Sequence, residues 1–381
     1  MKSEYMVRIA AVFAFALIAR PAHAAISETA IAAFDTARNG TDDAAIVATA
    51  RQLGAEALAN PEDARSGHLA FEAAETLCEF GQCADGRQFA AFALSAESGD
   101  DLPPLPERTL LKALTVWVTV PSHDHFVAFA TALDAVQPRA PTPVSMLAYE
   151  MFYSTLGNKD DLHNRFVIST LAANHIRPSR DEYPMAWAKM ELRSIANQHS
   201  ESQDPAVAMR ISDLQIWLLA KRRSGPEDSE TFKDIYYQTE AWNRAISTYY
   251  RSGKYNGNAE LDRARYNLEQ AMETIPDRSN WISEVRLPAC TGTFVKPPKL
   301  RYPTRARIRG YVGAAIVEYD LIDGEVRNID LLASVPSDVF DKYAIDAMKR
   351  AEWKFDNDQE NPACDRLGPI HGTYSFEFLM Q

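Results

Sequence analysis

The stretches GYVGAAIVEYDLIDGEVRNIDLL (310–332), SVPSDVFDKYAIDAMKRAEWKF (334–355) and GTYSFEFLM (372–380) decide the fold of the C-terminal part of this chain. Within the first of them, Asp323-Gly324 is a strong hairpin signal, since both residues tolerate the positive φ of a two-residue turn. Alternate residues before the turn form one face of a strand: Gly313, Ala315, Val317, Tyr319 and Leu321. After the turn, Val326 and Ile329 break the two-residue period, which predicts a β-bulge.

The second and third stretches predict a helix and a further strand. The helix has an apolar stripe at helical spacing, formed by Phe340, Ala344, Ala347, Met348 and Ala351. Trp353 and Phe355 then alternate with polar neighbours, so the chain becomes extended there. The last strand has one apolar face, formed by Tyr374, Phe376, Phe378 and Met380. Two paired strands, a helix packed across them and a third strand make a small α+β domain of ββαβ order.

The chain from Ile26 to Ile282 reads as helices separated by short breaks. Clear helical segments are Asp42–Ala59, Arg65–Phe80, Glu107–Thr119 and Asp204–Ala220. The last of these has an explicit start, because Asp204 can accept from free backbone amides and Pro205 fits the first turn. Buried stripes are predicted at two sets of positions: Val207, Ile211, Leu214 and Leu218, then Phe232, Ile235, Tyr236, Ile246, Tyr249 and Tyr250.

A series of such helices predicts stacked antiparallel pairs, as in helical-hairpin or solenoid-like folds. Ala264, Leu268, Ala271 and Pro276 resemble the second helix of a tetratricopeptide repeat. The resemblance covers one helix and does not recur at a spacing of about 34 residues. An irregular helical bundle therefore remains the alternative to a repeat array.

The N-terminus has the pattern of a cleaved secretory signal. Lys2 and Arg8 precede an apolar run, and small residues around His23 favour a cut after Ala24. The alternative is a membrane anchor, but the run of 11 residues is shorter than the ~20 that span a bilayer. We therefore predict a signal peptide (1–24), a helical repeat-like domain (25–287) and a C-terminal domain (288–381) in an exported protein.

Charge and cysteine usage also bear on the compartment and the partners. The chain has a net charge of −12, and the acidic excess falls on 25–287, which argues against nucleic-acid binding. Within the C-terminal domain, a basic run without intervening acids is either solvated surface or a contact for an anionic partner; it comprises Lys296, Lys299, Arg301, Arg305, Arg307 and Arg309. The four cysteines fit an oxidising compartment, and pairing of neighbours gives the candidate disulfides Cys78–Cys83 and Cys290–Cys364 among the pairings open to them.

No motif in the sequence argues for catalysis, a metal or a cofactor. His123-Asp124-His125 is the densest set of metal-ligand types, but a helical zinc pair needs a spacing of three or four residues. Ser122 before it is typical of a helix cap, so surface histidines are the better interpretation. Because no P-loop, dinucleotide fingerprint or G-x-S-x-G is present, we predict a protein that is not an enzyme.

The C-terminal residues resemble the TonB C-terminal domain family over roughly Pro297 to Gln381. The resemblance rests on the order and spacing of small motifs: Tyr302-Pro303 with Ala306, Gly310, Asp323-Gly324 with Val326, Ser334-x-Pro336, Phe340-Asp341, Ala344, Ala347-Met348, Trp353-x-Phe355 and Tyr374-x-Phe376-x-Phe378. It implies a periplasmic protein of Gram-negative type that binds a peptide segment of an outer-membrane receptor or transporter.

In this family the last strand adds a partner segment to its edge, so main-chain bonds supply affinity. Carried over by position, the candidate partner-binding residues are Thr373, Tyr374, Ser375, Phe376, Glu377, Phe378 and Leu379, with Pro336 and Phe340 from the motif before the helix. The alternative is an edge blocked by the helical domain or by a second copy of the chain, as a homodimer.

Three departures from TonB itself argue against energy coupling. The predicted signal is cleaved rather than retained as an anchor, and a helical domain stands where TonB has a proline-rich spacer. The motif Q-P-x-N-M-F lacks its glutamine and asparagine here, where Val335 and Asp338 stand. We therefore expect a protein-binding accessory of outer-membrane transport, or else a structural envelope adaptor whose helical domain binds a partner or peptidoglycan.

Overall fold

The computed structural model describes residues 25–97, 99, 101–156, 161–202, 204–224, 230–251, 258–273, 292–309, 311–322, 325–355 and 370–378. It divides into two compact units, Met1–Ala148 and Tyr149–Gln381, and each is described by itself. The predicted signal peptide and the predicted boundary at 287/288 lie outside the described residues and stay predictions. No helix in the described part of the chain is both long and apolar enough to span a bilayer.

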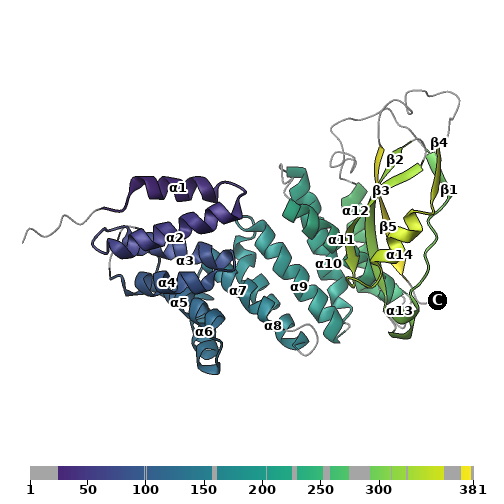
Figure 1. Cartoon of the computed structure of the whole chain (residues 1–381). Coiled ribbons are helices and arrows are strands. Elements are labelled where there is room, and N and C mark those ends of the chain that lie inside the picture. Colours follow the sequence, from purple (N-terminus) through teal and green to yellow (C-terminus); the bar gives the residue numbers. More distant parts are fainter. Residues whose placement is uncertain are drawn as a thin grey trace, which may run out of the picture. The chain divides into compact units, whose positions relative to one another are not determined.

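The first unit is a series of helices, as the periodicity predicts. Its elements are α1 (Glu28–Arg38), α2 (Asp43–Ala59), α3 (Ser66–Glu79), α4 (Cys83–Ser95), α5 (Leu105–Thr119), α6 (His123–Val136) and the first part of α7 (Pro143–Thr155). From α1 to α6 each helix packs against the next, and α3 also contacts α5 (Figure 1). This serial packing is typical of stacked helical pairs and confirms the helical, solenoid-like prediction.

Local capping explains several of the helix starts. Asp42 accepts hydrogen bonds from the amides of Ala44 and Ala45 at 3.0 and 3.2 Å, and thereby begins α2. Ser122 accepts from the amide of His125 at 3.2 Å and caps α6, as its position predicts. His123 is exposed, and the half-buried His125 has its Nδ1 2.6 Å from the Val120 carbonyl oxygen, in agreement with the surface interpretation.

One of the two predicted disulfides lies within the described residues. Cys78 and Cys83, five residues apart, are bonded and join the end of α3 to the start of α4. Both residues are buried, so the bridge belongs to the core of this helix pair. Cys290 and Cys364 lie outside the described residues, and their pairing stays a prediction.

Replacing Cys78 and Cys83 together by serine should lower the free energy of unfolding by about 2 kcal/mol, because a short closed loop no longer restricts the unfolded chain. Urea denaturation of the oxidised protein would measure this change. Dithiothreitol should shift the wild-type curve and leave that of a variant that lacks all four cysteines unmoved. An unchanged unfolding midpoint in the double variant would contradict the prediction.

The second unit combines helices and a sheet. Its helical elements are the rest of α7, α8 (Leu162–Ile176), the 3-10 turn η1 (Arg177–Ser179), α9 (Pro184–Ser202), α10 (Ala206–Ser224), α11 (Glu230–Arg251) and α12 (Ala259–Glu273). Asp204 accepts from the amide of Ala206 at 2.9 Å at the predicted start of α10. The predicted stripe residues on α10 are all buried, and α12 packs against α10. Pro276 of the repeat-like motif lies outside the described residues.

The sheet contains five antiparallel strands in the order β1-β4-β3-β2-β5 (Figure 1). Its elements are β1 (Gly292–Lys296), α13 (Thr304–Arg309), β2 (Gly313–Ile322), β3 (Glu325–Val335), α14 (Asp341–Met348), β4 (Glu352–Phe355) and β5 (Ile370–Phe378). The structure confirms the predicted α+β fold, and its sheet has five strands where the predicted ββαβ order has three. The extended residues near Trp353 form β4, which pairs with the unpredicted β1.

The β2–β3 hairpin forms as predicted. Ile322 pairs with Glu325 on either side of the Asp-Gly pair, which itself lies outside the described residues. The predicted bulge is present, since the register shifts between Glu318 and Asp320 opposite Asn328. Asn328 has a φ of 47° and donates to Asp320 Oδ2 at 2.7 Å, which satisfies a carboxylate buried at this bend.

Both faces of the sheet are covered, one by α14 and the other by α11. Odd-numbered residues of β2 pack with α14, whereas Ala314 and Ile316 pack with Ala241 and Ala245 of α11. Successive strand residues point to opposite faces, so β2 is buried on both sides. The sheet therefore shares a core with α11.

Candidate partner-docking edge

The candidate docking strand β5 lies at one edge of the sheet. Its inner edge pairs with β2 from Gly313↔Phe378 to Leu321↔Ile370. Among the described residues no strand pairs with its outer edge, where a partner segment would add. The position of β5 at the edge follows from the strand order, which the sequence pattern did not specify.

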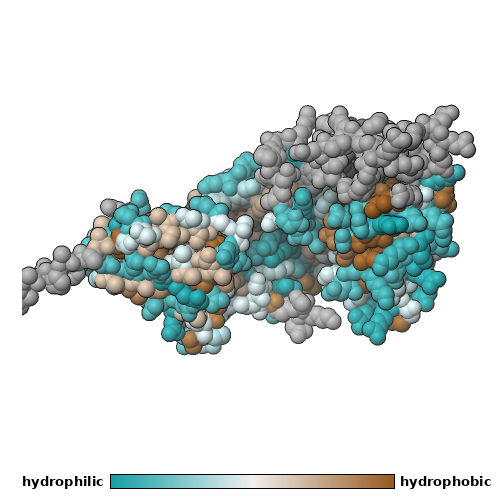
Figure 2. Space-filling model, turned by 45° about the horizontal axis from the view of Figure 1, so that its top comes forward, coloured by the Kyte–Doolittle hydropathy of each residue, from teal (hydrophilic) through white to brown (hydrophobic). Residues whose placement is uncertain are grey.

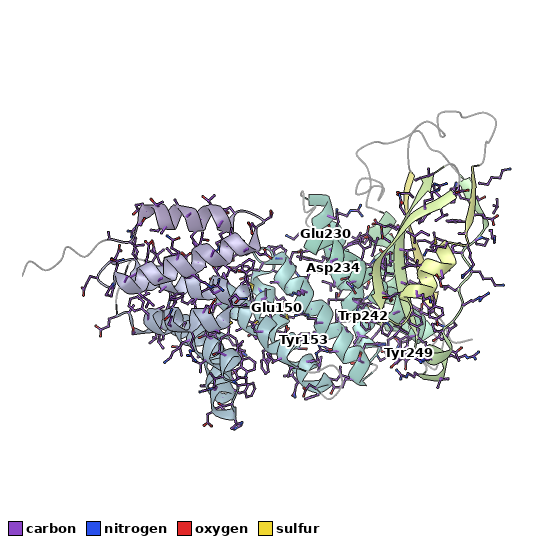
Figure 3. All side chains as sticks on the ribbon, in the orientation of Figure 1. Glu150, Tyr153, Glu230, Asp234, Trp242 and Tyr249 are labelled. Atoms are coloured by element: carbon purple, nitrogen blue, oxygen red, sulfur yellow. A yellow bond between two sulfur atoms is a disulfide. The ribbon has the colours of Figure 1, made fainter. Side chains whose placement is uncertain are left out.

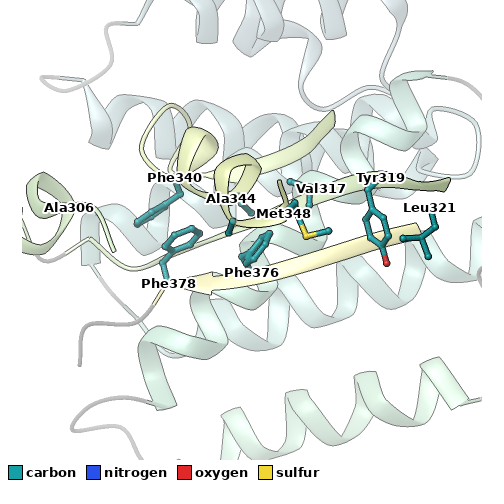
Figure 4. Packing of buried hydrophobic residues seen from close by; sticks show 11 residues of the cluster. Ala306, Val317, Tyr319, Leu321, Phe340, Ala344, Met348, Phe376 and Phe378 are labelled. Carbon is teal, nitrogen blue, oxygen red and sulfur yellow. The ribbon is translucent and has the colours of Figure 1, made fainter. Parts of the chain in front are cut away.

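One face of β5 is locked into the core beneath α14. The Phe378 ring stacks on Phe340 with centroids 4.1 Å apart (Figure 4). The Phe376 ring lies 4.8 Å from the Tyr374 ring. Phe340, Phe376 and Phe378 are at most 3% exposed. These three candidate residues therefore hold the strand in place by their side chains and can offer a partner only their backbone.

The other face of β5 is held by α11. Glu377 Oε2 accepts from the Thr248 hydroxyl at 3.0 Å, and Glu377 Oε1 lies 3.7 Å from an Arg244 guanidinium nitrogen. Arg244 also bonds Glu240 at 2.9 Å, so the contact belongs to a small charged network on the helix. Helix α11 thus fixes the orientation of the strand and leaves its outer edge unpaired by any described strand.

The remaining candidate residues differ in exposure. Thr373 is exposed, and Tyr374, Ser375 and Pro336 are half-buried. Leu379 lies outside the described residues. The structure brings the β5 candidates together along one strand, and it places Pro336 at the opposite end of β3 from the β2–β3 turn.

Beside Pro336 lies an aromatic hollow of about 240 Å³ that the sequence interpretation missed. Trp242 and Tyr249 of α11 line it (Figure 3), together with His199 and Tyr311. The His199 ring lies 5.3 Å from the Tyr249 ring and 6.2 Å from that of Trp242. Burial lowers the pKa of His199 to about 4, so the imidazole is neutral at ordinary pH.

A second hollow, of about 520 Å³, lies between the start of α11 and the bulged part of the hairpin. Its lining is acidic and includes Glu230, Asp234, Glu318, Asp320 and Asp330 (Figure 3 labels the first two). Burial, with the neighbouring Tyr236 next, raises the pKa of Tyr237 in this wall to about 12. In the described part of the chain, no three potential ligand side chains are arranged to hold a metal ion.

Comparison with protein families matches residues 298–378 to the Gram-negative bacterial TonB protein C-terminal family. Residues 298–378 form a TonB C-terminal domain. The match covers β2 to β5 together with α13 and α14, and it leaves out β1 and the helical region. Neither the curated proteins nor the solved structures contain a match to this chain.

The family assignment confirms the resemblance predicted from the motifs. TonB C-terminal domains are protein-interaction domains of the Gram-negative periplasm that contact outer-membrane proteins, and the family is not one of enzymes. In this chain the TonB C-terminal domain has α11 on its second sheet face, a helix outside the matched residues. The apolar residues Ala314 and Ile316, on the opposite face from the predicted stripe, were the sequence signal for that cover.

Proposed function

We propose that this chain is a periplasmic, TonB-type protein-binding accessory of outer-membrane transport. A short segment of an outer-membrane receptor or transporter would dock on β5 as an additional strand. The chain would act by binding rather than by catalysis, without energy coupling to an inner-membrane complex. The observation that supports this most is the place of β5 at the sheet edge with a neighbour on one side only among the described residues.

The anchoring of β5 on both faces supports the same proposal. Phe376 and Phe378 hold one face in the core, and Glu377 is held on the other by Thr248 and Arg244. A strand fixed in this way loses little further conformational entropy when a partner pairs with it. Its main-chain groups would supply affinity, and the exposed Thr373 with half-buried Tyr374 and Ser375 would select the partner's side chains.

A photo-crosslinking amino acid at Thr373, introduced in the full chain, would test this function directly. We expect crosslinks to an extended segment of an outer-membrane transport protein in periplasm-accessible membranes. The same crosslinker at Arg327, exposed on the interior strand β3, and at Val295 on the other edge strand β1 provides matched controls. Equal crosslinking at all three positions, or crosslinks to a second copy of the chain alone, would overturn the proposal.

Single prolines in β5 separate backbone pairing from side-chain contact. Successive amides of a strand point to opposite edges, so of Tyr374→Pro and Ser375→Pro one removes an outward donor while the other breaks pairing with β2. With the crosslinker at Thr373, we expect the variant that lacks the outward donor to stay folded and to lose the crosslink. Retention of the crosslink in both proline variants, each shown to be folded, would instead favour a structural adaptor whose helical region holds a partner or peptidoglycan.

A further inference from the structure

The basic run before β2 lies on the surface in a specific arrangement. Along residues 298–302 burial alternates: Pro298 is buried and Leu300 and Tyr302 are half-buried, while Lys299 and Arg301 are exposed. The Tyr302 ring packs 5.9 Å from Phe340, which fixes the segment against the domain. The two cations between these anchors therefore project outward.

Helix α13 continues this pattern with an apolar residue at its outermost point. Ala306 is 1% exposed and faces the core, whereas Ile308 is 79% exposed. At about 100° per residue, Ile308 lies nearly opposite Ala306, with Arg305 and Arg309 on one flank and Arg307 on the other. An exposed isoleucine is thus surrounded by guanidinium groups.

We call Lys299, Arg301, Arg305, Arg307 and Arg309 the basic rim. Each of the five is exposed, and none has a carboxylate partner among the described residues, in contrast to Lys296, which pairs with Glu352. Arg350 at the end of α14 donates to the Lys299 carbonyl oxygen at 3.4 Å, so the exposed Lys349 and Arg350 adjoin the rim. This concentration of cations without a described carboxylate partner stands out in a chain whose net charge is −12, and Arg309 lies over the Tyr311 ring at 6.0 Å.

We propose that the basic rim binds the surface of an anionic phospholipid bilayer, with Ile308 inserted among the headgroups. Cations near such a surface gain from its negative potential, and a neighbouring aliphatic side chain gains by leaving water. On the face in Figure 2, hydrophobic residues of the sheet-bearing part are set among hydrophilic ones.

The exposed isoleucine decides between a membrane and a soluble acidic polypeptide. Arginines alone would suffice for an acidic peptide, whereas a bilayer also rewards the burial of Ile308. Such binding would place the chain on a membrane surface without a spanning helix. It does not depend on the docking of a partner to β5.

Vesicle co-sedimentation of the chain from Ala25 to Gln381 tests the proposal. We expect binding to vesicles that contain phosphatidylglycerol, none to vesicles of phosphatidylcholine alone, and a decline with salt. The triple variant Arg305→Gln, Arg307→Gln, Arg309→Gln should bind about a hundredfold more weakly, at about fivefold per charge. Ile308→Ser should weaken binding about tenfold through lost apolar burial.

Matched controls separate the rim from general effects of charge and hydrophobicity. Arg87→Gln, Lys112→Gln, Arg263→Gln makes the same charge change at exposed positions elsewhere, and Leu105→Ser removes a comparable exposed aliphatic. Both control variants should bind like the wild type. The proposal is overturned if the chain does not bind phosphatidylglycerol vesicles, or if the control substitutions weaken binding as much as those in the basic rim. It is also overturned if polyglutamate or inorganic phosphate displaces the chain while Ile308→Ser leaves vesicle binding unchanged.

Discussion

Replacing Ile316 by aspartate is expected to unfold the sheet together with the helices that cover it. Ile316 is 1% exposed and packs against Ala241 and Ala245 of α11. The substitution removes a buried aliphatic side chain, which costs about 2–5 kcal/mol, and buries a carboxylate without a partner. The combined loss should exceed ~4 kcal/mol, a large share of the 5–15 kcal/mol that stabilises a typical domain.

Hydrogen exchange followed by mass spectrometry would measure this effect, because it reports on the amides of β2 and of α11 separately, apart from the helices of the first unit. We expect both segments to lose protection together, since the sheet and α11 share a core. Thr293→Asp provides the control, because Thr293 is exposed on β1 and lies opposite Lys354, so the new carboxylate stays in water and meets no like charge across the strands. It should change the free energy of unfolding by less than about 0.5 kcal/mol. Loss of protection in β2 while α11 stays protected would contradict the shared core.

The parts of the fold that local sequence patterns specify were predicted correctly. The Asp-Gly pair gives the hairpin because few residue pairs accept its backbone angles, and the broken period after Val326 gives the bulge. Helix α2 begins where Asp42 supplies a cap. Such features depend on neighbours in the chain, which a single sequence displays.

The features that were missed depend on distant partners. Strand β1 is short and exists by pairing with β4, about 60 residues later in the chain. The cover of the sheet by α11 could have been inferred, because AAIV at 314–317 is apolar on both faces of the strand. A strand with one solvated face would carry polar residues at 314 and 316.

In the candidate site, too, the features set by local sequence were predicted and those set by distant partners were not. The motifs identified a TonB C-terminal domain and its last strand, so Thr373 to Phe378 were named from the sequence. The burial of Phe340, Phe376 and Phe378 follows from their apolar face, yet the edge position of β5 is a property of strand order. The aromatic hollow at His199 joins α9, α11 and the sheet, and no local pattern connects those segments.

Glu75 gives the second large expected effect, on the pH dependence of stability. This residue lies half-buried on α3 in the first unit. Burial raises its pKa from 4.5 to about 7, and the nearby Glu79, Glu72 and Glu107 act in the same direction, while Arg38 opposes them. The folded protein therefore holds a proton on Glu75 at a pH where the unfolded chain has released it.

The sign of the effect follows from this difference in proton binding. Below pH 4.5, Glu75 is protonated in both the folded and the unfolded protein, and the stability that its raised pKa contributes is fully present. As the pH rises to about 7 the unfolded chain loses its proton first, so the free energy of unfolding falls by about 3 kcal/mol in total. Above that pH both states are ionised and this residue contributes no further change.

Glu75→Gln should remove this dependence, because glutamine mimics the protonated carboxyl at every pH. Urea denaturation at pH 8 should show the variant more stable than the wild type by about 3 kcal/mol, with the two nearly equal at acidic pH. Glu62→Gln, at an exposed position of the same unit, should differ from the wild type by less than about 0.5 kcal/mol throughout. A Glu75→Gln variant that differs from the wild type by the same amount at both pH values would show that folding does not raise the pKa of Glu75, since only a pKa that differs between the folded and unfolded states makes the difference depend on pH.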